Sequence, residues 1–155
     1  MKAKQQLLWW MTMLISGLIL IGIFLAPMVR EFQPAFSNFL YNLYSSFCHQ
    51  QPDRCYYLGD QALAVCSRCL GIYAGFFLGT FFYTFLPSSL RNWVIDRPVI
   101  ILFGAGPMIV DAAAGILKIW ASSLTFRLAT GIIWSIFLPF FWFQALNQLC
   151  QPDKS

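Results

Sequence analysis

Charged side chains are scarce in this chain of 155 residues, where Asp, Glu, Lys and Arg together hold only 10% of the positions. An average soluble domain carries about 25% charged residues, so this chain cannot cover a water-facing surface in the usual way. The ten basic residues are scattered singly and form no patch, which leaves no argument for a nucleic-acid partner. The chain also has no internal repeat, which argues against a transporter because many transporters are built from repeated halves.

Apolar residues take the place of the missing charge, at 59% of the chain, with aromatic residues at 18%. A run of about 20 apolar residues can cross a bilayer as a helix, and the sequence holds four such runs. It therefore predicts an all-α integral membrane protein that forms a single membrane domain over 1–155, with four transmembrane helices and one interfacial amphipathic helix. The predicted spans are 7–29, 69–86, 98–117 and 128–149, the interfacial helix is 34–47, and a Cys/His loop covers 48–69.

The first apolar run, 7–29, contains no charge and follows Lys2 and Lys4. A cleaved signal peptide has the same order of features. This run is too long for the apolar region of a signal peptide, and the sequence Leu-Ala-Pro at 25–27 offers no cleavage site of small residues. We therefore expect a retained first span.

Glycines mark one face of the second predicted span. Gly71, Gly75 and Gly79 recur at every fourth position, so this face has almost no side chain and another helix can approach closely. That helix could belong to the same chain or to a second copy in a dimer.

The basic residues that flank the spans bear on orientation. With the N-terminus in the cytoplasm, five basic residues fall on each side of the membrane. If Arg54, Arg68 and Arg127 are held in place by function, the remaining residues favour a cytoplasmic N-terminus under the positive-inside rule. The Cys/His loop would then face the opposite side, a periplasm or a lumen.

Four of the five cysteines and the only histidine lie within the 22 positions 48–69. Cys66 and Cys69 form a Cys-x-x-Cys pair that can chelate one tetrahedral metal ion, and Cys48 with His49 could complete a Cys3His set. Cys55 is a rival for the fourth position. Zinc is the expected metal for such a set, with iron, or copper(I) on the thiolates, as the alternative.

The same cysteines have two interpretations that need no metal. Four cysteines on an oxidising face of the membrane can pair as two disulfides. A Cys-x-x-Cys pair beside a helix N-terminus is also typical of a redox-active dithiol, although the surrounding strand and helix of a thioredoxin fold are missing. Cys150 stands far from the others and is expected to be a free thiol.

Asp111 is a carboxylate inside the third predicted span. A charge at that depth costs about 2.5–3.5 kcal/mol on insertion scales, so it normally faces the helix bundle and has a partner. Alternation of four spans puts Arg68 and Arg127 on the same side as this carboxylate. The three residues are candidate catalytic residues, with Asp111 as a general base or a polar ligand near the metal and the arginines as binders of a phosphate or anionic headgroup. A buried Asp–Arg clamp that fixes helix register is the structural alternative.

Several motifs resemble those of a known family. The segments Cys-His-Gln-Gln-Pro-Asp-Arg at 48–54 and Val-Cys-Ser-Arg-Cys-Leu-Gly-Ile-Tyr-Ala-Gly at 65–75, followed by Pro-x-x-x-Asp at 107–111 and Arg-Leu-Ala-Thr-Gly at 127–131, are similar to the motifs of a family of predicted membrane proteins, domain of unknown function 2085. The resemblance covers roughly 48–131. It implies a multi-span helical protein in which these motifs form one site, and it implies no reaction.

Two positions depart from the family pattern. Ala112 stands where a glycine often follows the aspartate, and Cys55 stands where a serine often follows the arginine. The second departure argues that Cys55 is not an obligatory metal ligand.

Together these features predict an interfacial site in which the Cys/His cluster and the intramembrane polar residues act on a lipid-like or phosphate-bearing amphiphile. Two other classes of function remain open. The protein could be a structural or assembly subunit whose loop is pinned by zinc or by disulfides, or a thiol redox protein of the membrane.

Overall fold

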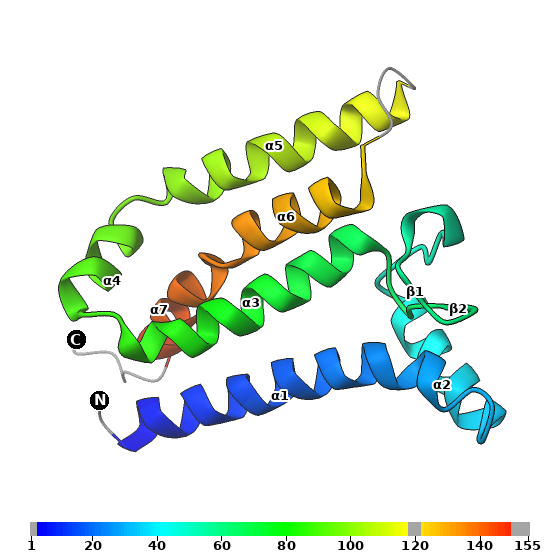
Figure 1. Ribbon diagram of the computed structural model, residues 1–155. Coiled ribbons are helices and arrows are strands. Elements are labelled where there is room, and N and C mark those ends of the chain that lie inside the picture. The colour runs from blue at the N-terminus through cyan, green and yellow to red at the C-terminus, as the bar shows by residue number, and fades with distance from the viewer. Residues whose placement is uncertain (1–2, 118–121, 150–155) are drawn as a thin grey trace.

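The computed structural model describes residues 3–117 and 122–149, and over these residues the protein is mostly helical (Figure 1). The helical class expected from the sequence is thus confirmed. The elements in chain order are α1 (Ala3–Met28), α2 (Pro34–Ser45), the short 3-10 helix η1 (Pro52–Arg54), β1 (Tyr57–Leu58), β2 (Gln61–Ala62), α3 (Ser67–Phe85), α4 (Ser88–Ile95), α5 (Val99–Ile116), α6 (Leu124–Ser135) and α7 (Leu138–Leu149).

Three stretches of the described chain are long and apolar enough to cross a membrane. Large apolar side chains project outward from them, as Leu18 of α1 (65% exposed) and Phe103 of α5 (79% exposed) illustrate. Apolar surface of this kind suits lipid better than water. The three stretches are Lys4–Met28 in α1, Val99–Ile116 in α5, and Leu124–Leu149, which contains α6 and α7.

The remaining long helix, α3, lies between α1 and α6 (Figure 1). It has 19 residues, but Arg68, three glycines and two tyrosines make it less apolar than the other three stretches. Its most extensive helix contact is with α6. α3 therefore lies in the middle of the row formed by α1, α3 and α6 (Figure 1).

The glycine face of α3 packs against α6 of the same chain. A methyl group added at Gly71 or Gly75 would overlap backbone atoms of Leu128 or Ile132, and one added at Gly131 would lie 2.6 Å from the carbonyl oxygen of Arg68. Ser135 strengthens the contact because its hydroxyl, which donates to Gly131 at 2.8 Å, also lies 3.4 Å from the Gly71 carbonyl oxygen. Close approach of small residues is the usual basis of helix packing in membranes, and here the partner helix lies within the monomer.

α2 packs against the C-terminal half of α1, and its buried residues are Ser37, Leu40 and Tyr44. The Tyr44 hydroxyl donates to the Ile19 carbonyl at 2.7 Å, and the Ser37 hydroxyl donates to the Ala26 carbonyl at the same distance. These two bonds hold α2 across the end of α1. α2 thereby positions the segment that follows it, which contains Cys48.

The structure adds three features to the predicted spans and loop. The segment 88–95, between the second and third predicted spans, forms the helix α4, and the predicted Cys/His loop contains a two-stranded hairpin in which Tyr57 pairs with Ala62 around a turn at Gly59. Gly59 has a φ of +61°, which glycine adopts without strain. The predicted fourth span, 128–149, lies in two successive helices, α6 and α7, because Pro139 has no N–H to bond the carbonyl four residues earlier.

Candidate metal centre

The Cys/His loop lies at one end of the helices, together with the last turn of α5 and the first turn of α6 (Figure 1). α4 and the start of α1 lie at the opposite end. Alternation of the helices thus brings segments that are far apart in the sequence to one end of the molecule. The candidate site is built where they meet.

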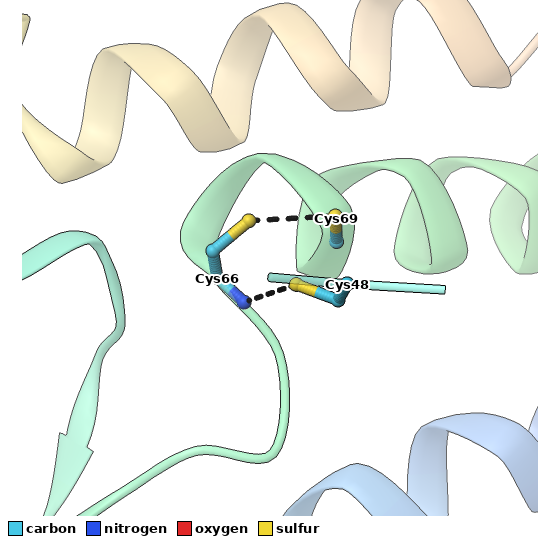
Figure 2. A group of neighbouring side chains, drawn as sticks. All are labelled: Cys48, Cys66 and Cys69. Atoms are coloured by element: carbon cyan, nitrogen blue, oxygen red, sulfur yellow. Dashed lines mark hydrogen bonds between the residues drawn. The ribbon is translucent and has the colours of Figure 1, made fainter. Parts of the chain in front are cut away.

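Cys48, Cys66 and Cys69 form a group in which all three sulfur atoms lie within 4.8 Å of one another (Figure 2). The Cys66 Sγ and Cys69 Sγ atoms are 3.4 Å apart, and the backbone N–H of Cys66 donates to Cys48 Sγ at 3.2 Å. A disulfide bond is about 2.05 Å long, so the three residues are free thiols here. Thiolates bound to one tetrahedral zinc ion at about 2.3 Å lie roughly 3.8 Å apart, which matches this spacing.

Local structure explains how these sulfurs meet. Cys66 is the N-cap residue of α3 and Cys69 lies one turn further on, so their side chains share one face of the helix start. Cys48 reaches them from the end of α2, where its backbone N–H donates to the Tyr44 carbonyl at 2.9 Å. Cys48 is 4% exposed and packs in a hydrophobic cluster with Val65.

Hydrogen bonding lowers the pKa of the Cys48 thiol. The Cys66 and Cys69 thiols and the backbone N–H of Cys66 hydrogen-bond to its sulfur, and these bonds hold the pKa of Cys48 far below its usual value. Cys55 behaves in the opposite way, since burial raises its pKa to about 11. Cys55 is outside the sulfur group and its thiol donates to the Gln51 carbonyl at 3.2 Å. The structure therefore sets Cys55 apart as a neutral thiol.

His49 follows Cys48 but is not a member of the sulfur group. It is exposed and lies in the wall of a cavity of about 340 Å³ next to the cluster. Its role as a fourth ligand stays a prediction.

The cavity beside the cluster is basic. Arg54, Arg68 and Arg127 contribute to its wall, and no acidic side chain does so among the described residues. Arg54 has an exposed ion pair with Asp53 at 3.6 Å. The Nε atom of Arg127 donates to the Ser122 hydroxyl at 2.7 Å, which leaves the two terminal nitrogen atoms of its guanidinium outside that bond.

Asp111 is paired with Arg68. Its carboxylate accepts a hydrogen bond from the Arg68 guanidinium in an ion pair, and its side chain is only 4% exposed against 24% for the arginine. Asp111 does not line the cavity, whereas Arg68 does. The structure thus brings two of the three candidate catalytic residues into direct contact, and Arg127 joins Arg68 at the cavity wall.

Gln50 lies close to the cluster, and its role was not predicted from the sequence. Its side-chain amide donates to the carbonyl oxygens of Tyr41 (2.7 Å) and Ala64 (2.8 Å), which ties the end of α2 to the segment before α3. Its φ of +47° is uncommon for a residue other than glycine. The sequence signals for Gln50 are its place directly after Cys48 and His49 and its inclusion in the motif at 48–54 that resembles the family pattern.

Comparison with known proteins identifies the family of the chain. The family model described as "Predicted membrane protein (DUF2085)" matches residues 48–141, a range that begins at the first cysteine of the cluster and includes Asp111 and Arg127. An uncharacterized protein of Methanocaldococcus jannaschii, MJ1492, is 33% identical over 132 residues, which cover 81% of this chain and 84% of that protein. No solved structure matches the chain significantly.

Proposed function

This chain belongs to the DUF2085 family of predicted membrane proteins, and from that premise we propose that it binds a zinc ion through clustered thiolates at one membrane face and acts there on a phosphate-bearing amphiphile. One observation carries the proposal. The sulfur group of Cys48, Cys66 and Cys69 lies in the wall of a cavity that three arginines also line.

The metal assignment is supported by ligand chemistry. Thiolates favour zinc, iron or copper(I) over the hard cations magnesium and calcium, and zinc is the default for a tetrahedral sulfur-rich site. His49 directly follows Cys48 and lines the same cavity, which makes it our candidate for the fourth ligand.

The substrate class is supported by the charge and the place of the cavity. Arg68 and Arg127 present guanidinium groups, which match phosphate oxygens in geometry and charge. Asp111 holds Arg68 by the buried ion pair, so we assign Asp111 as a positioning residue for that arginine. The cavity lies where the membrane-spanning helices end, which is the level of lipid headgroups.

We also propose the membrane arrangement that this function requires. α1, α3, α5 and the α6–α7 pair each cross the bilayer, the N-terminus is cytoplasmic, and the whole chain forms one membrane domain. α2 lies in the interface, since it exposes one apolar stripe to the surroundings while its other face packs on α1. The exposed residues of this stripe are Phe36, Phe39 and Leu43 on α2, and Phe47 just beyond it.

A structural role is the second candidate function. Cys48 belongs to a buried hydrophobic cluster that joins α1, α2, the loop and α3, so a metal ion at this position would pin the loop. In this alternative, loss of the metal should lower the yield of folded protein to the same degree as any activity.

The first experiment is metal analysis of the detergent-purified full-length protein by elemental mass spectrometry. We compare the wild type with Cys66→Ser/Cys69→Ser and use Cys55→Ser as the matched control, because Cys55 is buried near the cluster but outside it. We expect about one zinc ion per chain in the wild type and the control, and almost none in the double variant.

Size-exclusion chromatography on the same samples separates the two candidate functions. A metal-free double variant that stays monodisperse at normal yield supports the functional site, whereas collapse of the yield supports the structural role. A wild type without metal, or a double variant that keeps its metal, contradicts both.

A further inference from the structure

The start of α3 holds two buried polar atoms that lack a hydrogen-bond partner among the described residues. They are the hydroxyl oxygen of Ser67, a residue with 0% exposure, and the Nε atom of Arg68. Buried polar groups in proteins are almost always paired. Both residues line the cavity beside the thiol cluster, so a ligand in this cavity can supply the missing partners.

The positive charge at the start of α3 indicates which kind of ligand binds there. Cys66, the N-cap residue of α3, makes no side-chain capping bond, so the first-turn N–H groups of a 19-residue helix and the positive end of its dipole face this end. Arg127 adds a full positive charge on the cavity wall. A helix N-terminus with arginines and a hydroxyl donor is a favourable site for a phosphate group.

A second cavity indicates what the phosphate is attached to. It has a volume of about 350 Å³, is almost entirely apolar, and lies among α1, α3 and α7, with Ile15, Phe76 and Trp142 in its wall. Ile72 lines both cavities. The two spaces are therefore neighbours on α3, one basic at the helix start and the other apolar further along the helix.

We propose that the two cavities together bind one single-chain lipid with a phosphate monoester headgroup. The phosphate accepts hydrogen bonds from the Ser67 hydroxyl and from Arg68 and faces Arg127. The chain passes Ile72 and lies in the apolar cavity. This inference rests on the proposed function for the class of the ligand, and it names the residues that recognise each part.

The test measures binding of lysophosphatidic acid to the full-length protein in detergent micelles by native mass spectrometry and thermophoresis. Ser67→Ala and Arg127→Gln should each weaken binding about tenfold or more, because each removes a donor to a charged group. Ser89→Ala and Arg97→Gln are the matched controls, since both residues are exposed at the opposite end, on or beside α4, and both should bind like the wild type. Normal size-exclusion profiles show that the variants are folded.

Two further probes separate a lipid from a free phosphate. Lysophosphatidylcholine, whose phosphate is a diester next to a cation, should bind much more weakly than lysophosphatidic acid. Ile15→Trp should weaken binding of lysophosphatidic acid and leave inorganic phosphate unaffected, since Ile15 lines the apolar cavity and not the basic one. Inorganic phosphate that binds as tightly as the lipid, with no effect of Ile15→Trp, overturns the lipid proposal.

Binding of lysophosphatidic acid that neither Ser67→Ala nor Arg127→Gln weakens overturns the headgroup site itself. The zinc content of the same preparations keeps this outcome separate from the proposed function. Zinc without the expected binding refutes only this inference, and the expected binding without zinc refutes only the metal proposal.

Discussion

At the scale of single residues, the buried ion pair between Arg68 and Asp111 is the contact whose loss should be most easily measured. Asp111→Leu leaves the half-buried Arg68 without its counter-charge, and breaking a buried pair in this way typically costs about 3–5 kcal/mol. Arg68→Met/Asp111→Leu removes both charges and should recover most of that stability. Unfolding by sodium dodecyl sulfate in mixed micelles measures the free energies of the three proteins.

The double variant also separates stability from ligand binding. It should be folded yet bind lysophosphatidic acid weakly, because Arg68 lines the cavity. An equal loss of stability in the single and double variants would show that the charge pair is not what stabilises this contact.

The residues of the site could be found from the sequence to different degrees. Cys66 and Cys69 share a helix start, so their spacing alone predicts that they meet, and Cys48 belongs to the same short segment. The position of His49 outside the sulfur group depends on one loop conformation, which the periodicity of the sequence does not predict. Gln50 was missed for the same reason, because its function lies in a left-handed backbone and two bonds to distant carbonyls.

At the scale of the helices, the contact of α3 with α6 is the one most sensitive to side-chain size. Gly131→Ala should destabilise the protein by about 1–3 kcal/mol, because its methyl group would lie 2.6 Å from the Arg68 carbonyl oxygen. Gly115→Ala is the matched control, since no atom of the described residues lies within 4 Å of the added carbon, and it should leave stability unchanged or slightly raise it. Thermal unfolding in detergent compares the two. Equal melting temperatures for both variants and the wild type would refute the tight α3–α6 contact.

The helices were more predictable than their partners and ends. Apolar runs located the long helices because lipid imposes both their length and their composition. The repeat of Gly71, Gly75 and Gly79 predicted a close helix contact, but the partner became clear only when α6 presented Gly131 to the same face. Short elements such as α4 and the β1–β2 hairpin follow from local turn geometry that the apolar pattern does not contain.

At the scale of the whole molecule, the proposed four-span arrangement requires the thiol cluster and α4 to lie on opposite sides of the membrane. Asp60→Cys in the hairpin turn should react with a membrane-impermeant maleimide in intact cells, whereas Ser89→Cys should react only after permeabilisation. Peptide mass spectrometry locates the labelled residue and so distinguishes it from the native thiols. Labelling of both positions from the same side would contradict the four-span arrangement, and the reverse pattern would contradict the cytoplasmic N-terminus.

Convergence on one site was the feature of the whole molecule that the sequence predicted best. Alternating spans place Cys48, Cys66 and Arg127 on one side whatever the absolute orientation, and the structure brings all three to one cavity. The cavity itself and its apolar neighbour depend on how side chains pack, which the order of spans does not determine.

The most direct test of the proposed thiolate metal centre is X-ray absorption at the zinc edge on the purified wild-type protein. We expect three sulfur ligands at about 2.3 Å and one nitrogen ligand at about 2.0–2.1 Å, with the nitrogen signal lost in His49→Ala and the sulfur signal reduced in Cys48→Ser. A zinc ion surrounded only by nitrogen and oxygen, or a sulfur signal unchanged by Cys48→Ser, would contradict this metal centre.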